Sequence, residues 1–394
     1  MDLSYRLRKG QFHLLAYGLW LLLPLIPMAS PWATSLGMAP NVAAWLPLFI
    51  GFVVAPLLHF IFPASLPSLS SNEKLDSAWR LYLDSLIIAS VPLQMLMLLV
   101  SAKFWTSGQI DLIGSMAYLA GVGSFSGFCA INVGHELIHS HVITTDQIKS
   151  NGGFLLLSSS RGASISRLLG SLLLYSVCFG SFSAEHLKSH HLYVGTPKDC
   201  YTAKRAQSIY SFTFQTLAAY FRHSFSVKKQ LLEPQATTLL SGSILFQTLA
   251  SLVFLIMFFF AWRWSGLIFF LGQSIVAIVL MGWVVYLQHY GINRKQDSSG
   301  RIEPVREWHA WNEKSWIMDI YLLNLYRHAD HHVNPNKPFY LLSESSIAPS
   351  YPYPFFIMML LSLIPPLFYS VTHRVLDSHP ILSKAQIPIG HLEK

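Results

Sequence analysis

Residues 112–139 read LIGSMAYLAGVGSFSGFCAINVGHELIH, and this stretch decides the fold. It carries no charged side chain up to Gly134, and a helix needs about 20 such residues to cross a bilayer core. His135 and His139 follow at a spacing of four, which puts both imidazoles on one helix face. The stretch therefore predicts a membrane-spanning helix that ends in two candidate metal ligands.

The composition extends this prediction to the whole chain of 394 residues. Hydrophobic residues make up 52% and charged residues only 12%, whereas soluble domains carry about 25% charged residues. The mean hydropathy is +0.42. So little charge cannot cover the surface of a soluble protein of this size, and an integral membrane protein is predicted.

Uncharged runs long enough to cross a bilayer recur along the chain. We predict six spans, over residues of about 14–29, 43–63, 85–102, 112–134, 240–262 and 266–288. The expected fold is all-α, a six-transmembrane-helix bundle in a single domain over 1–394, with a cytoplasmic histidine-rich cap and extra interfacial helices. The first run lacks a small-residue cleavage pattern, so a cleaved signal peptide is not expected.

Lysine and arginine fall almost entirely on one side of these spans. Of the 27, only Lys103 and Arg263 lie in the connections on the opposite side. The positive-inside rule then places both termini and the two long segments, 135–239 and 289–394, in the cytoplasm. Two further apolar stretches, Leu168–Ala184 and Pro354–Tyr369, are expected to lie at the interface without crossing.

Four clusters hold nine of the 17 histidines. They are His135 and His139; His186, His190 and His191; His289; and His328, His331 and His332. In the second cluster His186 and His190 repeat the spacing of four, and the adjacent His191 can turn toward a second metal. Nine imidazoles are too many for one ion, whereas two metals with four or five imidazoles each account for the number.

Three other interpretations compete with this one. His135-Glu136-Leu137-Ile138-His139 matches the His-Glu-x-x-His pattern of zinc peptidases, but such a site takes only three protein ligands. Purely structural histidines are disfavoured because imidazoles near a membrane are costly and tend to be functional. A metal transporter should carry ionisable ligands in mid-span, where the sequence offers little. Lone histidines are expected to be ordinary surface or interface residues, namely His13, His59, His223, His373, His379 and His391.

The neighbouring residues narrow the chemistry. Imidazole suits Fe, Cu, Zn or Ni. The three cysteines form no Cys-x-x-Cys pair, and no Rossmann glycine fingerprint occurs, so electrons for redox chemistry must come from another protein. The carboxylates Glu136, Glu185 and Asp330 lie inside or beside the clusters and are expected to accept hydrogen bonds from ligand imidazoles.

Longer strings around the histidines carry a family resemblance. They are His135 to His139; Glu185 to His191 with Val194-Gly195-Thr196-Pro197-x-Asp199; Leu287 to Gly291; Gly300-Arg301 with His309-Ala310-Trp311-Asn312; and Asn324 to His332 with Pro335 and Tyr340-Leu341-Leu342. Together they resemble the integral-membrane alkane 1-monooxygenases, or alkane hydroxylases, of the membrane fatty-acid desaturase and hydroxylase superfamily. The resemblance implies a di-iron centre, two Fe ions held by the nine histidines. It also implies that His309 belongs to a marker motif and, with Asn312, supports the ligands.

The resemblance further implies an activity, the O2-dependent terminal hydroxylation of medium-chain alkanes to primary alcohols in a bacterial inner membrane. Electrons would come from rubredoxin and its NAD(P)H-dependent reductase, and no nucleic-acid partner is expected. Basic residues could steer an acidic rubredoxin or bind anionic lipid, namely Lys198, Lys204, Arg205, Arg222, Lys228 and Lys229. The alternative is a membrane desaturase, or a hydroxylase of another lipid or of an aromatic methyl group such as that of xylene.

Two features bear on the substrate. Small residues in the span 112–134 could line a path for the hydrocarbon or could equally permit close helix packing, namely Ser115, Ala117, Ala120, Gly121, Gly123 and Gly127. The chain departs from the family pattern at Ser189, at Cys200-Tyr201 and in a longer Ser/Gly-rich connection over 140–167. These departures concern the substrate range and the loop contacts rather than the metal site.

Overall fold

The computed structural model describes residues 14–61, 66–68, 75, 77–139, 160–225 and 244–385. Within these ranges the regular structure is helical, and strand-like pairing is limited to the isolated bridges Gln296–Ile302 and Asn312–Ser350. The predicted all-α class is therefore confirmed. The Ser/Gly-rich connection lies largely outside the described residues, as do Lys228 and Lys229.

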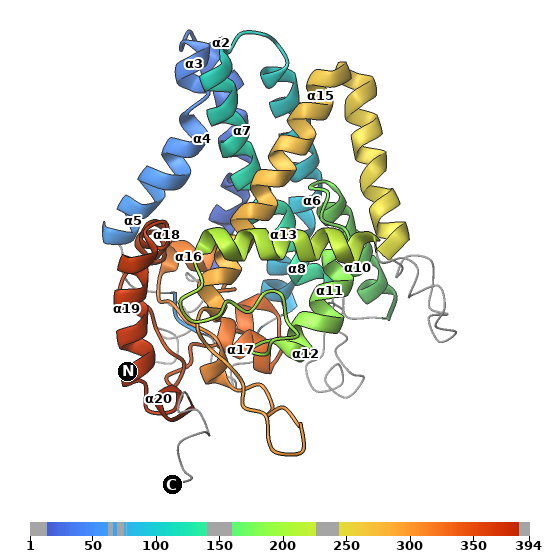
Figure 1. The fold of residues 1–394 in the computed structure, drawn as a ribbon. Coiled ribbons are helices and arrows are strands. Elements are labelled where there is room, and N and C mark those ends of the chain that lie inside the picture. The colour runs from blue at the N-terminus through green and yellow to red at the C-terminus, as the bar shows by residue number, and fades with distance from the viewer. Residues whose placement is uncertain are drawn as a thin grey trace.

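The helices fall into an apolar bundle and a cap that carries most of the histidines (Figure 1). The bundle contains η1 (Tyr17–Leu22), α2 (Leu25–Ser35), α3 (Pro40–Ala43), α4 (Leu46–Phe49), η2 (Ile50–Val54), α5 (Ala55–Ile61), α6 (Ser77–Trp105), α7 (Leu112–Ser126), η3 (Gly127–Asn132), α8 (Val133–Ile138) and α15 (Ile244–His289). The remaining elements are α10 (Ser160–Tyr175), α11 (Phe182–Glu185), η4 (His186–His190), α12 (His191–Tyr193), α13 (Ile209–Phe225), η6 (Glu307–His309), α16 (Trp316–Tyr321), α17 (His328–Val333), η7 (Phe339–Leu341), α18 (Phe355–Ser362), α19 (Pro365–Ser378) and α20 (Leu382–Ala385).

Several of these helices are long and apolar enough to cross a membrane. Four qualify by length and composition: Pro40–Ile61, Ala78–Trp105, Leu112–Ile138 and Gln247–His289. A fifth is formed by Leu14–Leu22 and Leu25–Ser35 if this pair, bent by 48°, counts as one span. The chain is therefore an integral, multi-pass membrane protein with four to five candidate spans.

The long helix α15 is a helical hairpin (Figure 1). The chain leaves helical geometry at Trp262 and at Arg263, which has φ 57° and ψ −143°, and the two arms run over 244–261 and 264–289. The rings of Phe254 and Phe270, one from each arm, stack with centroids 6.0 Å apart. A Cβ on Gly266 would lie 2.3 Å from the carbonyl oxygen of Phe258, so this tight reversal requires glycine. The break predicted near Arg263 is thus present.

Helix α7 packs closely against its neighbours through glycine. A Cβ on Gly123 would lie 2.5 Å from Cβ of Val276 and 2.7 Å from the carbonyl oxygen of Gln273, both on α15. A Cβ on Gly121 would lie 2.6 Å from Cβ of Pro47. Small residues let membrane helices approach this closely, and packing therefore accounts for these two glycines without a substrate path.

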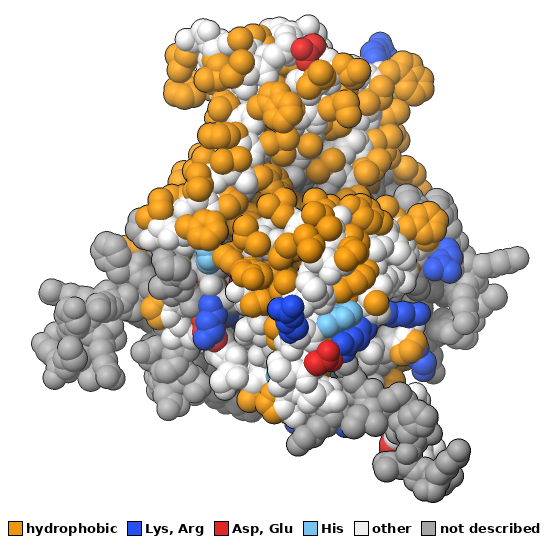
Figure 2. All heavy atoms as spheres, turned by 60° about the vertical axis from the view of Figure 1, so that its left-hand side comes forward, with side chains coloured by type: hydrophobic (Ala, Val, Ile, Leu, Met, Phe, Trp, Pro, Cys, Tyr) orange, Lys and Arg blue, Asp and Glu red, His pale blue; other side chains and the backbone are white. Residues whose placement is uncertain are grey.

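The surface divides into an apolar part and a charged part. Figure 2 shows hydrophobic side chains covering the upper part of the molecule and most Lys and Arg side chains on the lower part. Leu112, Phe260 and Trp264 are 76%, 71% and 68% exposed, which suits contact with lipid. Helix α13 lies across the base of the bundle, with Tyr210 and Phe214 exposed, as an interfacial helix would.

The two stretches expected at the interface do not form candidate spans. Over 168–184 the chain ends α10 at Tyr175, turns, and returns as α11, which leads directly to the histidines of η4. Over 354–369 it forms α18 and the first turn of α19, two short helices separated before Pro365. Pro365 fits the first turn of α19 because that position needs no backbone N–H donor.

A single added methyl group at Gly123 tests the packing of α7 on α15. We expect Gly123→Ala to destabilise the protein by about 1–3 kcal/mol because the helices must separate, and to lower its thermal unfolding midpoint in detergent. Gly282→Ala is the matched control, since an added Cβ there meets only Thr216 Oγ1 at 3.6 Å. Equal midpoints for the two variants would contradict the packing argument.

Candidate metal centre

The nine predicted histidines come together in two buried groups at one end of the bundle. The first group contains His135, His139, His186, His191 and His331, and the second contains His190, His289, His328 and His332. Within each group the candidate ligand nitrogens all lie within 4.8 Å of one another. They are contributed by the ends of α8 and α15, by η4 and α12, and by α17.

The five-histidine group is built around close contacts between Nε2 atoms. Nε2 of His139 lies 3.2 Å from that of His135, 3.1 Å from that of His186 and 3.2 Å from that of His191. Nε2 of His186 and Nε2 of His191 are 2.9 Å apart. The ring of His331 completes the group, with its centroid 4.7 Å from that of His135. Five imidazoles from three separate segments therefore face one point.

The four-histidine group has the same character. Nε2 of His289 lies 2.9 Å from Nε2 of His328 and 3.2 Å from Nε2 of His332, and the latter two atoms are 3.0 Å apart. The His190 ring lies beside them, with its centroid 4.9 Å from that of His289. The two groups are neighbours, because the rings of His191 and His332 have centroids only 4.7 Å apart.

The pairing within the second sequence cluster does not follow the helical spacing of four. His186 pairs with His191 in the five-histidine group, and His190 turns to the other group. The cause is local, because residues His186–His190 form a π-helical turn, in which the repeat is five residues rather than four. In α17 the ordinary helical spacing holds: His328 and His332 share a group, and His331 faces the other.

Burial disfavours the charged form of several of these imidazoles. It lowers the pKa of His186, His328 and His332 well below the usual range, and the neighbouring histidines lower it further. Burial likewise lowers the pKa of His191 to about 3, with a contribution from His190. Neutral imidazole is the form that binds a metal, so these four side chains are ready for an ion at neutral pH.

One carboxylate orients a histidine of the centre directly. Oδ2 of Asp199 lies 3.0 Å from Nδ1 of His190 and accepts a hydrogen bond from the Thr202 hydroxyl at 2.6 Å. This contact leaves Nε2 of His190 to face the four-histidine group. Among the described residues, Nδ1 of His328 and His332 has no hydrogen-bond partner. Asp199 stood in the quoted Thr-Pro-x-Asp string but was not predicted as a site residue.

The three carboxylates predicted beside the ligands hold other parts of the chain. Glu136 accepts a hydrogen bond from the backbone N–H of Phe339 at 3.0 Å. Asp330 pairs with Nζ of Lys337 at 2.6 Å. Glu185 accepts from the Cys200 thiol at 3.3 Å. Their predicted hydrogen bonds to ligand imidazoles are not tested by these contacts and stay predictions.

The His309-to-Asn312 string connects two ligand-bearing helices. Trp311 donates its backbone N–H to the carbonyl of Gln288 at 2.9 Å and its indole N–H to the carbonyl of Tyr290 at 2.8 Å, on either side of His289. Oδ1 of Asn312 accepts from the backbone N–H of Ala329 at 3.2 Å, next to His328. The string therefore fixes the position of α17 relative to the end of α15, and Trp311 is a supporting residue that the sequence reasoning missed.

His309 itself lies outside both groups. Its Nε2 is 3.2 Å from Oε1 of Glu303, and its Nδ1 accepts the backbone N–H of Arg306 at 2.9 Å. Burial lowers the pKa of His309 to about 4 despite the opposing effect of Glu303. Its contacts bind the 303–309 loop together, which is a supporting role.

The candidate ligand nitrogen atoms have the spacing expected of atoms bound to one metal ion. A metal–imidazole bond of about 2.0–2.1 Å places two neighbouring ligands of one ion, at right angles, about 3 Å apart. The Nε2 contacts of 2.9–3.2 Å match that separation in both groups. Two buried, all-imidazole groups side by side are therefore suited to a pair of metal ions.

Comparisons with known proteins agree with this geometry. Residues 112–374 match the family model described as fatty acid desaturase. Alkane 1-monooxygenase 2 of Pseudomonas aeruginosa is 31% identical over 363 residues, which cover 90% of each chain. Alkane 1-monooxygenase 1 of the same organism is 28% identical over 90% of this chain and 89% of its own length.

Another relative matches only about half of this chain, and its name differs from those of the first two. The xylene/toluene monooxygenase hydroxylase component of Pseudomonas putida is 29% identical over 198 residues, 47% of this chain and 49% of that protein. The matched family region contains all nine histidines of the two groups. On these matches the chain belongs to the fatty acid desaturase family and, with the alkane 1-monooxygenases, to its non-haem di-iron oxidoreductases.

Proposed function

We propose that the chain hydroxylates the terminal methyl group of medium-chain alkanes with O2, giving primary alcohols, at a di-iron centre held by the nine histidines. The observation that carries this proposal is the pair of adjacent all-histidine groups at the end of an apolar bundle. Relatives named as alkane 1-monooxygenases match 90% of the chain, whereas the xylene/toluene relative matches 47%. An alkane substrate is therefore favoured over an aromatic methyl group.

The two groups divide the proposed metal ligands. The five-histidine group would hold one iron and the four-histidine group the other. When bound, the irons supply the redox chemistry, the reduction of O2 by two electrons with insertion of one oxygen atom into a C–H bond. The protein supplies neutral ligands in fixed positions and a site that is shielded from water, since eight of the nine histidines are buried.

The supporting residues have proposed roles in positioning. Asp199 holds the His190 ring so that Nε2 faces its group, and Asn312 holds the start of α17. Glu136 and Asp330 form hydrogen bonds with other parts of the chain next to the histidines. His309 forms a hydrogen bond within the loop that leads to Asn312. None of these residues needs to touch the substrate.

The membrane arrangement is part of the proposal. Counting each arm of α15 and the bent pair η1–α2 as one span gives the predicted six spans. We infer that the histidine end faces the cytoplasm of a bacterial inner membrane, with both termini on that side, because it carries most of the Lys and Arg. A hydrocarbon dissolved in the bilayer could then reach the centre from the apolar side, and rubredoxin with its NAD(P)H-dependent reductase could supply electrons from the cytoplasm.

Product analysis tests the activity. With the chain expressed in bacterial membranes and supplied with octane, O2, a rubredoxin and its reductase, we expect 1-octanol by gas chromatography. Membranes without the chain are the control. Alkene products, or a strict requirement for an acyl-CoA substrate, would contradict the proposed alkane hydroxylation.

Two adjacent histidines test the metal assignment. His331→Ala removes a ligand from the five-histidine group and His332→Ala removes one from the other. We expect each variant to lower the iron content of the purified protein from about two ions per chain to about one or fewer, measured by mass spectrometry. His379→Ala, outside both groups, should keep both ions. Undiminished iron and activity in either ligand variant would refute the assignment.

The role of Asp199 is tested by removing its charge. We expect Asp199→Asn to weaken iron binding by about 10–100-fold in chelator competition, because the orientation and basicity of His190 depend on the carboxylate. Asp377→Asn is the matched control, since Asp377 pairs with Arg205 at the surface. Iron affinity equal to that of the control variant would show that the contact with His190 has no such effect.

A further inference from the structure

One buried amide of the bundle has an unused hydrogen-bond donor next to the metal centre. Asn132 is 4% exposed and ends the π-helical turn η3, directly before α8. Among the described residues, its Nδ2 atom has no hydrogen-bond partner. A polar group buried without a partner costs free energy, and such groups inside membrane proteins tend to be functional. The Asn132 amide is therefore a candidate binding group.

Other buried amides of the bundle use their nitrogen atoms within the protein. Nε2 of Gln94 donates to the hydroxyl of Ser126 at 3.3 Å. Nε2 of Gln247 donates to the hydroxyl of Ser183 at 2.9 Å. Asn132 departs from this pattern, so helix packing does not explain why an amide stands at this position.

Asn132 lies on the helix face that carries two of the candidate ligands. It precedes His135 by three residues and His139 by seven. Seven residues are almost two turns of an α-helix, so Asn132 and His139 lie on one face. The side chain of His135 leans back toward Asn132, because side chains on a helix tilt toward its N-terminus. The helix runs from the apolar bundle down to the histidines (Figure 1), and Asn132 is therefore on the bundle side of the five-histidine group.

The surroundings of Asn132 are apolar. The turn η3 packs against α6, α10 and α15. The ring of Phe128 contacts that of Tyr321 on α16, with centroids 5.1 Å apart. The chain neighbours Ile131 and Val133 are fully buried. A ligand of this amide must therefore combine one hydrogen-bond acceptor with an apolar chain.

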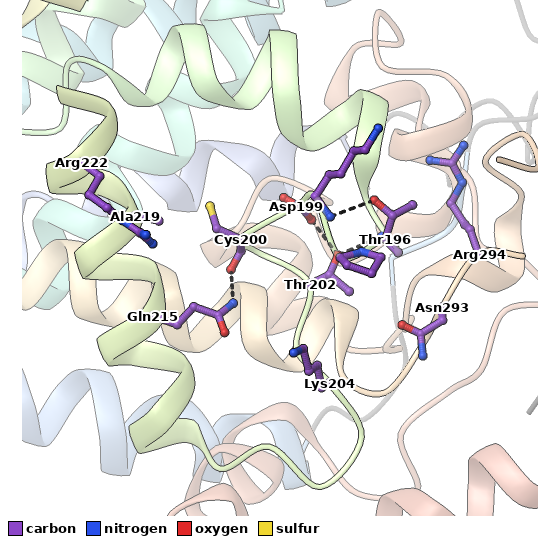
Figure 3. Close-up of a pocket in the computed structure, with 13 residues that line it drawn as sticks. Thr196, Asp199, Cys200, Thr202, Lys204, Gln215, Ala219, Arg222, Asn293 and Arg294 are labelled. Atoms are coloured by element: carbon purple, nitrogen blue, oxygen red, sulfur yellow. Dashed lines mark hydrogen bonds between the residues drawn. The ribbon is translucent and has the colours of Figure 1, made fainter. Parts of the chain in front are cut away.

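The loop side of the centre has a different character. A cationic recess of about 910 Å³ lies between the 195–204 segment, α13 and the 293–294 loop. Figure 3 shows Asp199 among the residues that line it. The lining includes four cationic residues, Lys198, Lys204, Arg222 and Arg294. A ligand with an apolar chain therefore belongs on the bundle side of the centre, where Asn132 lies.

We propose that Asn132 binds the hydroxyl group of a primary alcohol, with Nδ2 donating to the hydroxyl oxygen and the alkyl chain lying in the bundle. The inference rests on the proposed function, in which this alcohol is formed beside the histidines. An alkane offers no acceptor to the amide, whereas the alcohol formed from it offers one. A carboxylate would bring a buried negative charge that a neutral amide does not balance. Asn132 thus discriminates the product from the substrate and retains the product.

Binding of the alcohol to the full-length protein tests the proposal. Wild type and Asn132→Leu are placed in identical lipid nanodiscs with deuterated 1-octanol, and the amount bound above that of empty discs is measured by mass spectrometry. We expect Asn132→Leu to raise the dissociation constant for 1-octanol by about three- to tenfold, the effect of one hydrogen bond, and to leave that for octane unchanged. Gln94→Leu is the matched control, because its amide donates within the bundle, and it should bind 1-octanol as the wild type does.

Thermal unfolding distinguishes a binding role from a structural one. Because leucine removes a buried amide that lacks a partner, Asn132→Leu should raise the unfolding midpoint in the absence of alcohol. A structural amide would instead lower the midpoint when it is replaced. With 1-octanol present the difference should narrow, because the hydroxyl group stabilises the wild type more than the variant.

Turnover separates this proposal from the proposed function. With octane as substrate, the inhibition constant for added 1-octanol should rise in Asn132→Leu by the same factor as the dissociation constant, while the KM for octane stays the same. Wild-type protein that makes no alcohol from octane, yet binds 1-octanol more tightly than Asn132→Leu does, would overturn the proposed function and leave the alcohol site standing.

Two results would overturn the alcohol site. One is an equal dissociation constant for 1-octanol in the wild type and in Asn132→Leu. The other is a lowered unfolding midpoint of Asn132→Leu together with loss of iron, which would make Asn132 a structural support of His135.

Discussion

The structure depends on holding nine imidazoles close together in a largely buried space. In each group at least two Nε2 atoms lie within 3.0 Å of each other, a distance at which facing lone pairs repel unless a cation or a shared proton lies between them. Four separate segments must therefore end at one place with fixed ring directions. The glycine contacts of α7 and the reversal within α15 serve this need, because they fix where the helix ends at His135 and His289 arrive.

An all-imidazole centre has an electrostatic consequence. Neutral ligands cancel none of the charge of two metal cations, so the compensating negative charge must come from the surroundings. Asp199 and Glu185 are buried near the centre, and Asp199 contacts a ligand directly. The cationic recess lies on the outer side of Asp199, so the carboxylate screens its positive charge from that of the metals. The arrangement lets a basic surface lie next to a positively charged centre.

Much of the fold and of the candidate site could be predicted from the sequence, for identifiable reasons. Long uncharged runs predict helices, and the break at Arg263 predicted the turn inside α15. All nine grouped histidines were found by clustering and resemblance. The partition around His190 and His191 could not be found, because the π-helical turn depends on tertiary packing rather than on a visible motif. Asp199 was missed because a carboxylate eight or nine residues from the histidines gives no helical-face signal.

The two metal groups are coupled through the backbone. His190 and His191 are consecutive residues that face different groups, and so are His331 and His332. An ion bound in one group would therefore hold two chain segments, His186–His191 and His328–His332. The same two segments also supply three histidines of the other group. In the proposed two-iron centre, the first ion would fix η4 and α17 in place, and the second would then have less conformational freedom to remove. Each shared segment is short, so ligands of one group cannot move far without moving ligands of the other. Loss of one ion would therefore weaken the binding of the other. A two-metal centre built in this way would favour full occupancy over the half-filled state, as the proposed two-iron reaction requires.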